Sequence, residues 1–209
     1  MDSSPSPTPT HLANPSLRFG SSLAELEEAV EGAGFQRFRA RQIYRWWYAH
    51  GESDPQKMSN LPAALRDLLP HPGSTEPGTL VQRPVLPASP SKASRSDDGT
   101  IKYLFPTERG GLVEAASIPE ERRHTLCLST QVGCRRSCHF CMTARQGFQG
   151  NLSCGAILNQ YHSLPERDAV TNIVYMGMGE PLDNLDGTLA SLAVLTDPEA
   201  YAFSRNRIT

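Results

Sequence analysis

Cysteine is absent from most of this sequence. Residues 1–126 and 155–209 contain none, and all five cysteines fall within residues 127–154. A secreted domain held together by disulfides spreads paired cysteines along its chain, so an odd and crowded set argues against that class. The distribution favours a metal site together with reactive thiols in a reducing compartment.

Long apolar runs and a strong net charge are also lacking. No apolar stretch approaches the roughly 20 residues that a membrane helix needs, so we expect a cytoplasmic protein without a membrane segment. Residues 1–20 have no apolar signal core and only one arginine, and their serine and proline content predicts a disordered tail. The net charge of −2 means that any RNA-binding surface must be a local patch.

The next segment, 21–70, is predicted to be a small helical accessory domain. Ser22 and Glu25 have the spacing of a capping box at the start of a helix that ends near Gly32. Two more helices are expected at 38–50 and at about 62–69. Residues 71–98 are rich in turn-forming residues and predict a linker.

Residues 99–209 show a different pattern, which predicts an α/β fold. Strands are expected at 100–105, 111–118, 125–130 and 170–176, with a turn at Arg109-Gly110-Gly111 between the first two. Helices are expected after Ser153 and at 186–196, and residues 205–209 resemble the start of a further strand. The alternation of strand and helix predicts a parallel layer or partial (β/α) barrel, which this chain would leave incomplete.

The residues most indicative of chemistry are Cys134, Cys138 and Cys141, in the pattern C-x3-C-x2-C. Three thiolates this close together can hold one iron–sulfur cluster and leave one iron open, where the amino and carboxylate groups of S-adenosylmethionine (SAM) could bind. The alternative is a zinc knuckle completed by His139 or Cys154.

A second signal follows the apolar strand at 170–176, which runs into Gly-Met-Gly-Glu-Pro-Leu at 177–182. Glycines at the carboxyl end of a strand let the backbone approach a ligand, and α/β folds bind ligands at such ends. Glu180 places a carboxylate there that suits an ammonium group. An ordinary strand-to-helix turn is the alternative, but the nearby cysteine motif favours a ligand site.

Taken together, these motifs resemble those of the RlmN family of radical SAM enzymes. The resemblance rests on CLSTQVGC, on CHFCMTARQGF and on NIVYMGMGEPLDN, and the segment FRARQIYRWWY resembles that family's accessory domain. It covers about 20–209 except the linker. It implies a partial radical SAM barrel in 99–209 and an N-terminal fragment of a longer enzyme, so the 209-residue chain itself is expected to be inactive.

The resemblance also implies a role for each matching residue. Cys134, Cys138 and Cys141 would ligate one 4Fe–4S cluster. Phe140 would lie near the SAM adenine, and Gly179 and Glu180 would bind the methionine end of SAM. Glu114 would be the proton acceptor, and Cys127 would resolve a methyl-cysteine intermediate by forming a disulfide. A buried structural cysteine and a solvated glutamate are the alternatives for the last two residues.

The activity implied is methylation of C2 of adenine in large-subunit rRNA and in tRNA, 3′ of the anticodon. C2 is not nucleophilic, so radical chemistry is needed. The family resemblance further implies an electron donor of flavodoxin or ferredoxin type and a monomeric enzyme. Two alternatives remain, a C8-adenine methyltransferase of the resistance type and a non-catalytic iron–sulfur or zinc-binding remnant. One departure is Gly150, where the family usually has arginine.

Overall fold

A computed structural model describes residues 18–69, 87–108 and 110–209. The greater part of the predicted tail, residue 70 of the predicted accessory domain, residues 71–86 of the predicted linker and Arg109 of the predicted turn lie outside these ranges. Within them no helix is both long and apolar enough to cross a membrane.

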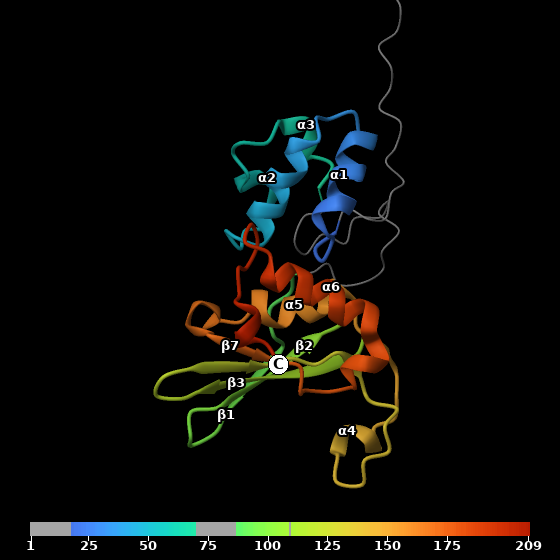
Figure 1. The fold of residues 1–209 in the computed structure, drawn as a ribbon, viewed down its shortest axis with the longest axis vertical. Coiled ribbons are helices and arrows are strands. Elements are labelled where there is room, and N and C mark those ends of the chain that lie inside the picture. Colours follow the sequence, from blue (N-terminus) through green and yellow to red (C-terminus); the bar gives the residue numbers. More distant parts are fainter. Residues whose placement is uncertain (1–17, 70–86, 109) are drawn as a thin grey trace, which may run out of the picture.

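The N-terminal helices form as the local sequence signals predict. Helix α1 (Leu23–Gly32) begins after Ser22, whose side chain accepts the Glu25 N–H while the Glu25 side chain accepts the Ser22 N–H. Helix α2 (Phe38–Trp47) is shorter than expected, and after the turn η1 (Pro55–Lys57) the third helix α3 (Ala63–Arg66) is a single turn. Figure 1 shows α1–α3 together at one end of the molecule.

A five-stranded sheet forms the other part, in the order β1-β2-β3-β4-β7. Its strands are β1 (Lys92–Arg95), β2 (Ile101–Pro106), β3 (Leu112–Pro119), β4 (His124–Cys127) and β7 (Asn172–Val174). The first three pairings are antiparallel, and β4 pairs with β7 in parallel. A separate pair consists of β5 (Gln131–Val132) and β6 (Gly150–Asn151).

The predicted barrel is not seen in the described residues, where the sheet is open. Strands β1–β4 follow one another through tight connections, and such connections produce antiparallel neighbours. Alternation of strand and helix starts only at β4 and continues through α5 (Cys154–His162), β7 and α6 (Leu185–Thr196), with the short turns η2 (Arg167–Ala169) and η3 (Pro181–Asn184) between them. The expected last strand is reduced to η4 (Arg205–Arg207) and one parallel bridge between Ile208 and Ile173. Strand β1 lies within the segment predicted to be a linker, so the sequence did not predict this strand.

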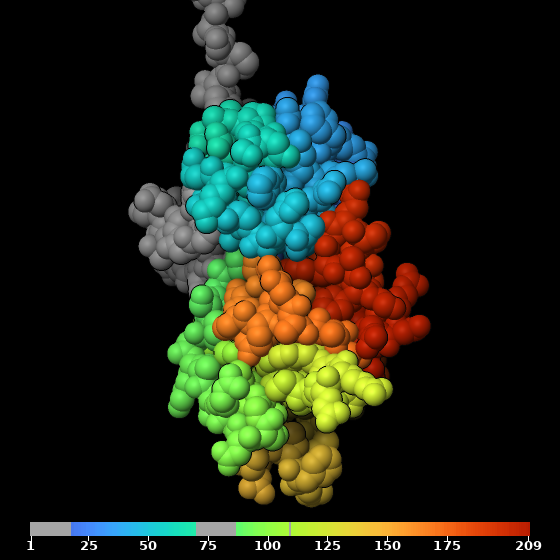
Figure 2. Space-filling view, turned by 90° about the vertical axis from the view of Figure 1, so that its left-hand side faces the viewer, coloured from blue at the N-terminus to red at the C-terminus, as the bar shows by residue number. Residues whose placement is uncertain are grey.

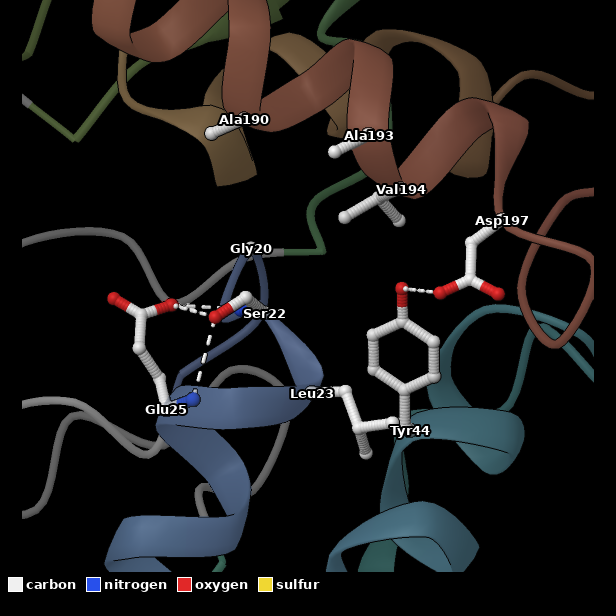
Figure 3. Close-up of a pocket in the computed structure, with 9 residues that line it drawn as sticks. All are labelled: Gly20, Ser22, Leu23, Glu25, Tyr44, Ala190, Ala193, Val194 and Asp197. Carbon is white, nitrogen blue, oxygen red and sulfur yellow. Dashed lines mark hydrogen bonds between the residues drawn. The ribbon is translucent and has the colours of Figure 1, made fainter.

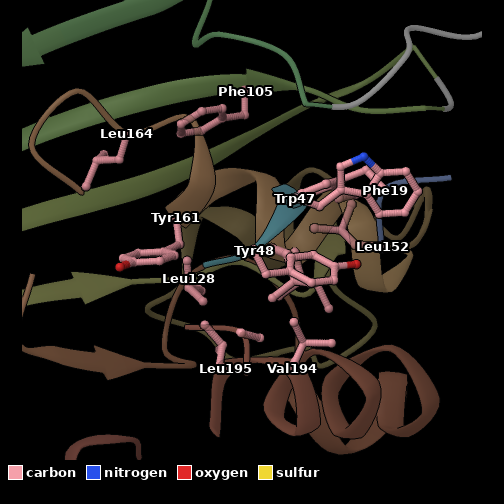
Figure 4. Close-up of a cluster of buried hydrophobic side chains, with 14 of the residues drawn as sticks. Phe19, Trp47, Tyr48, Phe105, Leu128, Leu152, Tyr161, Leu164, Val194 and Leu195 are labelled. Carbon is pink, nitrogen blue, oxygen red and sulfur yellow. The ribbon is translucent and has the colours of Figure 1, made fainter. Parts of the chain in front are cut away.

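The two parts share one hydrophobic core. Helices α5 and α6 lie on one side of the sheet, and α1–α3 lie beyond them (Figure 1). Phe19 packs against Tyr48, and Tyr48 against Tyr201, with ring centroids 5.4 and 5.5 Å apart (Figure 4 shows Phe19 and Tyr48). The buried cluster extends without a break from α1 and α2 to the sheet. The accessory helices are therefore packed onto the α/β part rather than tethered to it.

A small cavity remains at this junction. It lies between α1, α2 and α6, has a volume of about 170 Å³, and is bordered by the hydrogen bond from Tyr44 Oη to Asp197 Oδ2, 3.0 Å long (Figure 3). Ligand pockets usually measure about 300–1,000 Å³, so this one is smaller than a cofactor site.

Candidate functional site

The carboxyl ends of β4 and β7 stay side by side beyond the strands themselves. The Leu128 N–H donates to the Val174 carbonyl oxygen at 2.8 Å, and the Gly177 N–H donates back to the Leu128 carbonyl oxygen at 3.0 Å. The Thr130 N–H then reaches the Met178 carbonyl oxygen at 2.8 Å. The parallel pairing predicted for 170–176 is confirmed, and it brings both predicted motifs to one edge of the sheet.

Close packing of backbone explains the two glycines of the Gly-Met-Gly-Glu segment. A Cβ on Gly177 would lie 2.7 Å from the Leu128 carbonyl oxygen, which is too close for any side chain. Gly179 has a φ of +95°, and a Cβ there would lie 2.5 Å from the Gln131 Cβ. These glycines therefore let residues 177–179 lie against 128–131.

Buried polar side chains hold this arrangement in place, and sequence analysis did not identify them. The Ser129 hydroxyl donates to the Glu114 carbonyl oxygen at 2.5 Å and accepts the Met178 N–H at 2.7 Å. Gln160, from α5, bonds both the N–H and the carbonyl oxygen of Ser129 at 2.9 Å. The signal that could have found Ser129 is a run of polar residues, Ser-Thr-Gln, placed between an apolar strand and the cysteine motif.

Glu180 is partly buried and directs its carboxylate toward the following turn. Its Oε1 atom accepts the Leu182 N–H at 3.1 Å, and its own N–H donates to Gln131 Oε1 at 3.0 Å. Within the described part of the chain Oε2 has no hydrogen-bond partner in the structure. One carboxylate oxygen thus remains able to accept a hydrogen bond from a ligand.

The cysteine motif lies on a loop whose base is closed by two glycines. A Cβ on Gly133, which has a φ of +71°, would lie only 1.7 Å from the Gly147 carbonyl oxygen, so the two backbones touch. Between them the loop carries the one-turn helix α4 (Met142–Arg145). Figures 1 and 2 show this loop at the end of the molecule opposite α1–α3. Gly150, just after it, is buried in β6 opposite Val132.

The chemistry of the loop thiols suits metal ligation. Cys134, Cys138 and Cys141 are all free thiols with some exposure. The Cys134 Sγ accepts the Arg136 N–H at 3.3 Å, and hydrogen bonds from the Ala144 and Thr143 N–H groups lower the pKa of Cys141. Such bonds stabilise thiolates and are typical of iron–sulfur ligands. The donor set therefore fits a 4Fe–4S cluster, although no three His, Cys, Asp or Glu side chains of the described ranges are gathered as a metal site.

Two arginines of the loop make side-chain contacts. Arg136 Nη2 lies 2.6 Å from Asp183 Oδ1 in η3, three residues after Glu180, and so links the cysteine loop to the Glu180 turn. The Arg135 guanidinium lies 3.9 Å from the centre of the Phe148 ring. Phe140, predicted to lie near the SAM adenine, is 92% exposed.

The remaining two predicted residues share one face of the sheet. Cys127 pairs directly with Ala116, and Glu114 is two residues from Ala116 on β3, so both side chains project to the same side. That side is the partly exposed one, since Val113 and Ala115 are buried on the opposite face. Burial raises the pKa of the Cys127 thiol, and Glu114 Oε1 lies 3.2 Å from Lys102 Nζ.

Comparison with known proteins identifies the family. A family model described as the ribosomal RNA large subunit methyltransferase N-terminal domain matches residues 19–71. A probable dual-specificity RNA methyltransferase RlmN of Bacteroides thetaiotaomicron is 45% identical over 190 residues, which are 91% of this chain. The chain belongs to the RlmN family. It spans about half the length of the curated relatives it matches, 52% in the case just named.

A second relative and a solved structure agree with this assignment. The dual-specificity RNA methyltransferase RlmN of Syntrophobacter fumaroxidans is 42% identical over 191 residues, covering 90% of this chain and 53% of the relative. The crystal structure of a radical SAM methyltransferase from Sphaerobacter thermophilus matches with a TM-score of 0.76 and 36% identity, covering 91% of this chain and 55% of that one. The fold is therefore a mixed α/β fold resembling that enzyme, with N-terminal helices.

Proposed function

We propose that this RlmN-family chain carries the cluster- and SAM-binding residues of a radical SAM RNA methyltransferase acting on C2 of adenine, in large-subunit rRNA and in tRNA. The observation that carries the proposal is the meeting of the two motifs. Paired strand ends bring the cysteine loop and the Glu180 turn to one edge of the sheet, and the ion pair between Arg136 and Asp183 connects them.

In this proposal Cys134, Cys138 and Cys141 hold the cluster. When bound, the cluster supplies the electron that cleaves SAM, delivered by a donor of flavodoxin or ferredoxin type. The free oxygen of Glu180 accepts a hydrogen bond from the SAM ammonium group, and Gly179 keeps the adjoining backbone close to the strand ends. Phe140 offers an exposed aromatic ring to the SAM adenine.

The residues that accept or release protons lie on the shared face of β3 and β4. Glu114 is the carboxylate that accepts the proton from the substrate carbon. Because burial raises the pKa of Cys127, its thiol keeps its proton at neutral pH, and its sulfur can form a disulfide only after that proton has left. Cys127 would thus react only after a base has taken its proton and its partner sulfur lies within disulfide reach, and the bond between that sulfur and the transferred carbon would break as the disulfide forms.

The experiment is anaerobic reconstitution of the 209-residue chain with iron and sulfide. We expect about four irons per chain, as a 4Fe–4S cluster requires. Replacing Cys134, Cys138 or Cys141 with alanine should each abolish iron uptake, whereas Cys154→Ala, at the partly buried start of α5, serves as the matched control and should retain it. Stoichiometric zinc in the purified chain with no iron uptake would contradict the proposal.

SAM binding supplies an independent measurement. Glu180→Gln preserves the shape of the side chain and its bond to the Leu182 N–H but removes the charge. Calorimetry on the reconstituted chain should show weaker SAM binding in Glu180→Gln with unchanged iron content. Equal affinity for SAM in the wild-type and variant chains would contradict a role for Glu180 in SAM binding.

A further inference from the structure

The cysteine loop carries positive charge and no negative charge. Residues 133–149 contain Arg135, Arg136, Arg145 and His139, and neither aspartate nor glutamate. All three arginines are exposed. The chain as a whole has a net charge of −2, so this loop is a positively charged patch on a slightly negative protein.

Among the described residues, only Arg136 of these three arginines has a carboxylate partner. Arg136 forms the ion pair with Asp183, and its charge is therefore balanced. Of the carboxylates in the described ranges, none lies within ion-pair distance of Arg135 or Arg145. Two guanidinium groups on the loop thus keep their full charge for a partner.

The position of Arg135 is constrained by its neighbour. Its guanidinium lies 3.9 Å from the centre of the Phe148 ring, a cation–π contact that restricts the side chain while leaving N–H donors at the edge of the guanidinium free. The loop itself is closed at its base by the contact between Gly133 and Gly147. An arginine held in this way loses less side-chain entropy when it binds an anion.

We propose that Arg135 and Arg145 bind the phosphate backbone of RNA beside the adenine that reacts. This inference rests on the proposed function. An adenine acted on at its ring carbon must leave its stack and approach the cluster, so its flanking phosphates must pass the loop that holds the cluster. Guanidinium groups without a carboxylate partner match phosphate in both charge and geometry.

The test measures RNA binding as a function of salt. The variant is Arg135→Gln/Arg145→Gln in the 209-residue chain. The matched control is Arg95→Gln/Arg122→Gln, which removes the same charge from two exposed arginines near the amino-terminal end of β4, away from the loop. The probe is a fluorescently labelled, adenine-containing single-stranded RNA, and its anisotropy gives the affinity between roughly 50 and 200 mM NaCl.

We expect the slope of log affinity against log salt to fall by about 1.4 in the loop variant, because each phosphate contact to a single strand contributes about 0.7. The same relation gives binding about 25-fold weaker at roughly 0.1 M salt. The control should keep the wild-type slope. Iron content after reconstitution should be the same in all three proteins.

Several results would overturn the assignment. These are an unchanged slope in the loop variant, an equal loss in the control, or no salt-dependent RNA binding by the wild-type chain. Loss of iron in the loop variant would also overturn it, because the arginines would then support the loop rather than bind RNA. A wild-type chain that takes up no iron contradicts the proposed function, whereas the salt slopes still decide the role of the arginines.

Discussion

Replacing Gly133 with alanine tests whether close backbone packing sets the base of the cysteine loop. The added Cβ would lie 1.7 Å from the Gly147 carbonyl oxygen, whereas real Cβ contacts stay above 3.0 Å. The two strands of the loop base would have to separate by more than about 1 Å, because both contacting groups are backbone. That movement would disrupt the bond from the Gln149 N–H to the Val132 carbonyl oxygen, now 2.9 Å, and the β5–β6 pairing beside it.

Gly147→Ala provides the matched control. Gly147 has a φ of +69°, close to the +71° of Gly133, but a Cβ there would meet nothing within 4 Å. Both variants therefore carry the same left-handed strain of roughly 1–2 kcal/mol. Only Gly133→Ala adds the steric clash and the lost hydrogen bonds, each worth about 1 kcal/mol.

Thermal unfolding and iron content are the measurements. We expect Gly133→Ala to be less stable than Gly147→Ala by about 2–3 kcal/mol, which for a chain of this size lowers Tm by about 4–12 °C. Gly133→Ala should also take up little iron on reconstitution, because its three cysteines would no longer share a closed loop, whereas Gly147→Ala should retain it. Equal Tm values and equal iron content in the two variants would refute the reasoning.

Three further outcomes are expected. Tyr44→Phe removes the 3.0 Å hydrogen bond to Asp197 and should lower stability by about 1 kcal/mol, seen as a Tm lower by about 2–4 °C; an unchanged Tm would contradict a role for this bond. Burial lowers the pKa of His162 to about 4 from 6.5, so the fold favours its neutral form. The free energy of unfolding therefore keeps its full value above pH 6.5 and falls toward pH 4 by up to about 1.4 kcal/mol per pH unit. Urea unfolding should show that this free energy depends less steeply on pH in His162→Gln. Burial raises the pKa of Cys154 to about 12, so iodoacetamide at about pH 8 should modify exposed Cys138 in the folded chain well before the partly buried Cys154. Equal rates of labelling of the two thiols, measured by mass spectrometry, would contradict this difference.

Local signals in the sequence were sufficient for the elements that depend on neighbouring residues. The capping box of Ser22 and Glu25 and the cap at Ser153 each act within one helical turn, and both start helices where predicted. The apolar run of β7 predicted parallel pairing because a strand buried on both faces has that composition.

Features that depend on distant partners were harder to predict from the sequence. Strand β1, with the sequence Lys-Ala-Ser-Arg, has no apolar alternation and forms because the edge of β2 offers backbone partners. The barrel was expected from alternation that starts only at β4. The bonds from Gln160 to Ser129 join residues 31 positions apart, and no short sequence window contains both. The roles of the individual site residues stay predictions, since the sulfurs of the cysteine motif are not gathered in the described ranges.

The unbroken core from α1 to the sheet fixes the distance between the accessory helices and the sheet. A Cβ on Gly20 would lie 2.3 Å from the Gly155 nitrogen, so the chain entering α1 lies directly against the start of α5 and has no room to slide. The accessory helices and the sheet therefore pack as one body, and the cysteine loop lies at the end opposite the helices (Figures 1 and 2). A folded partner can therefore contact both ends at once only if its own dimensions match the distance between them.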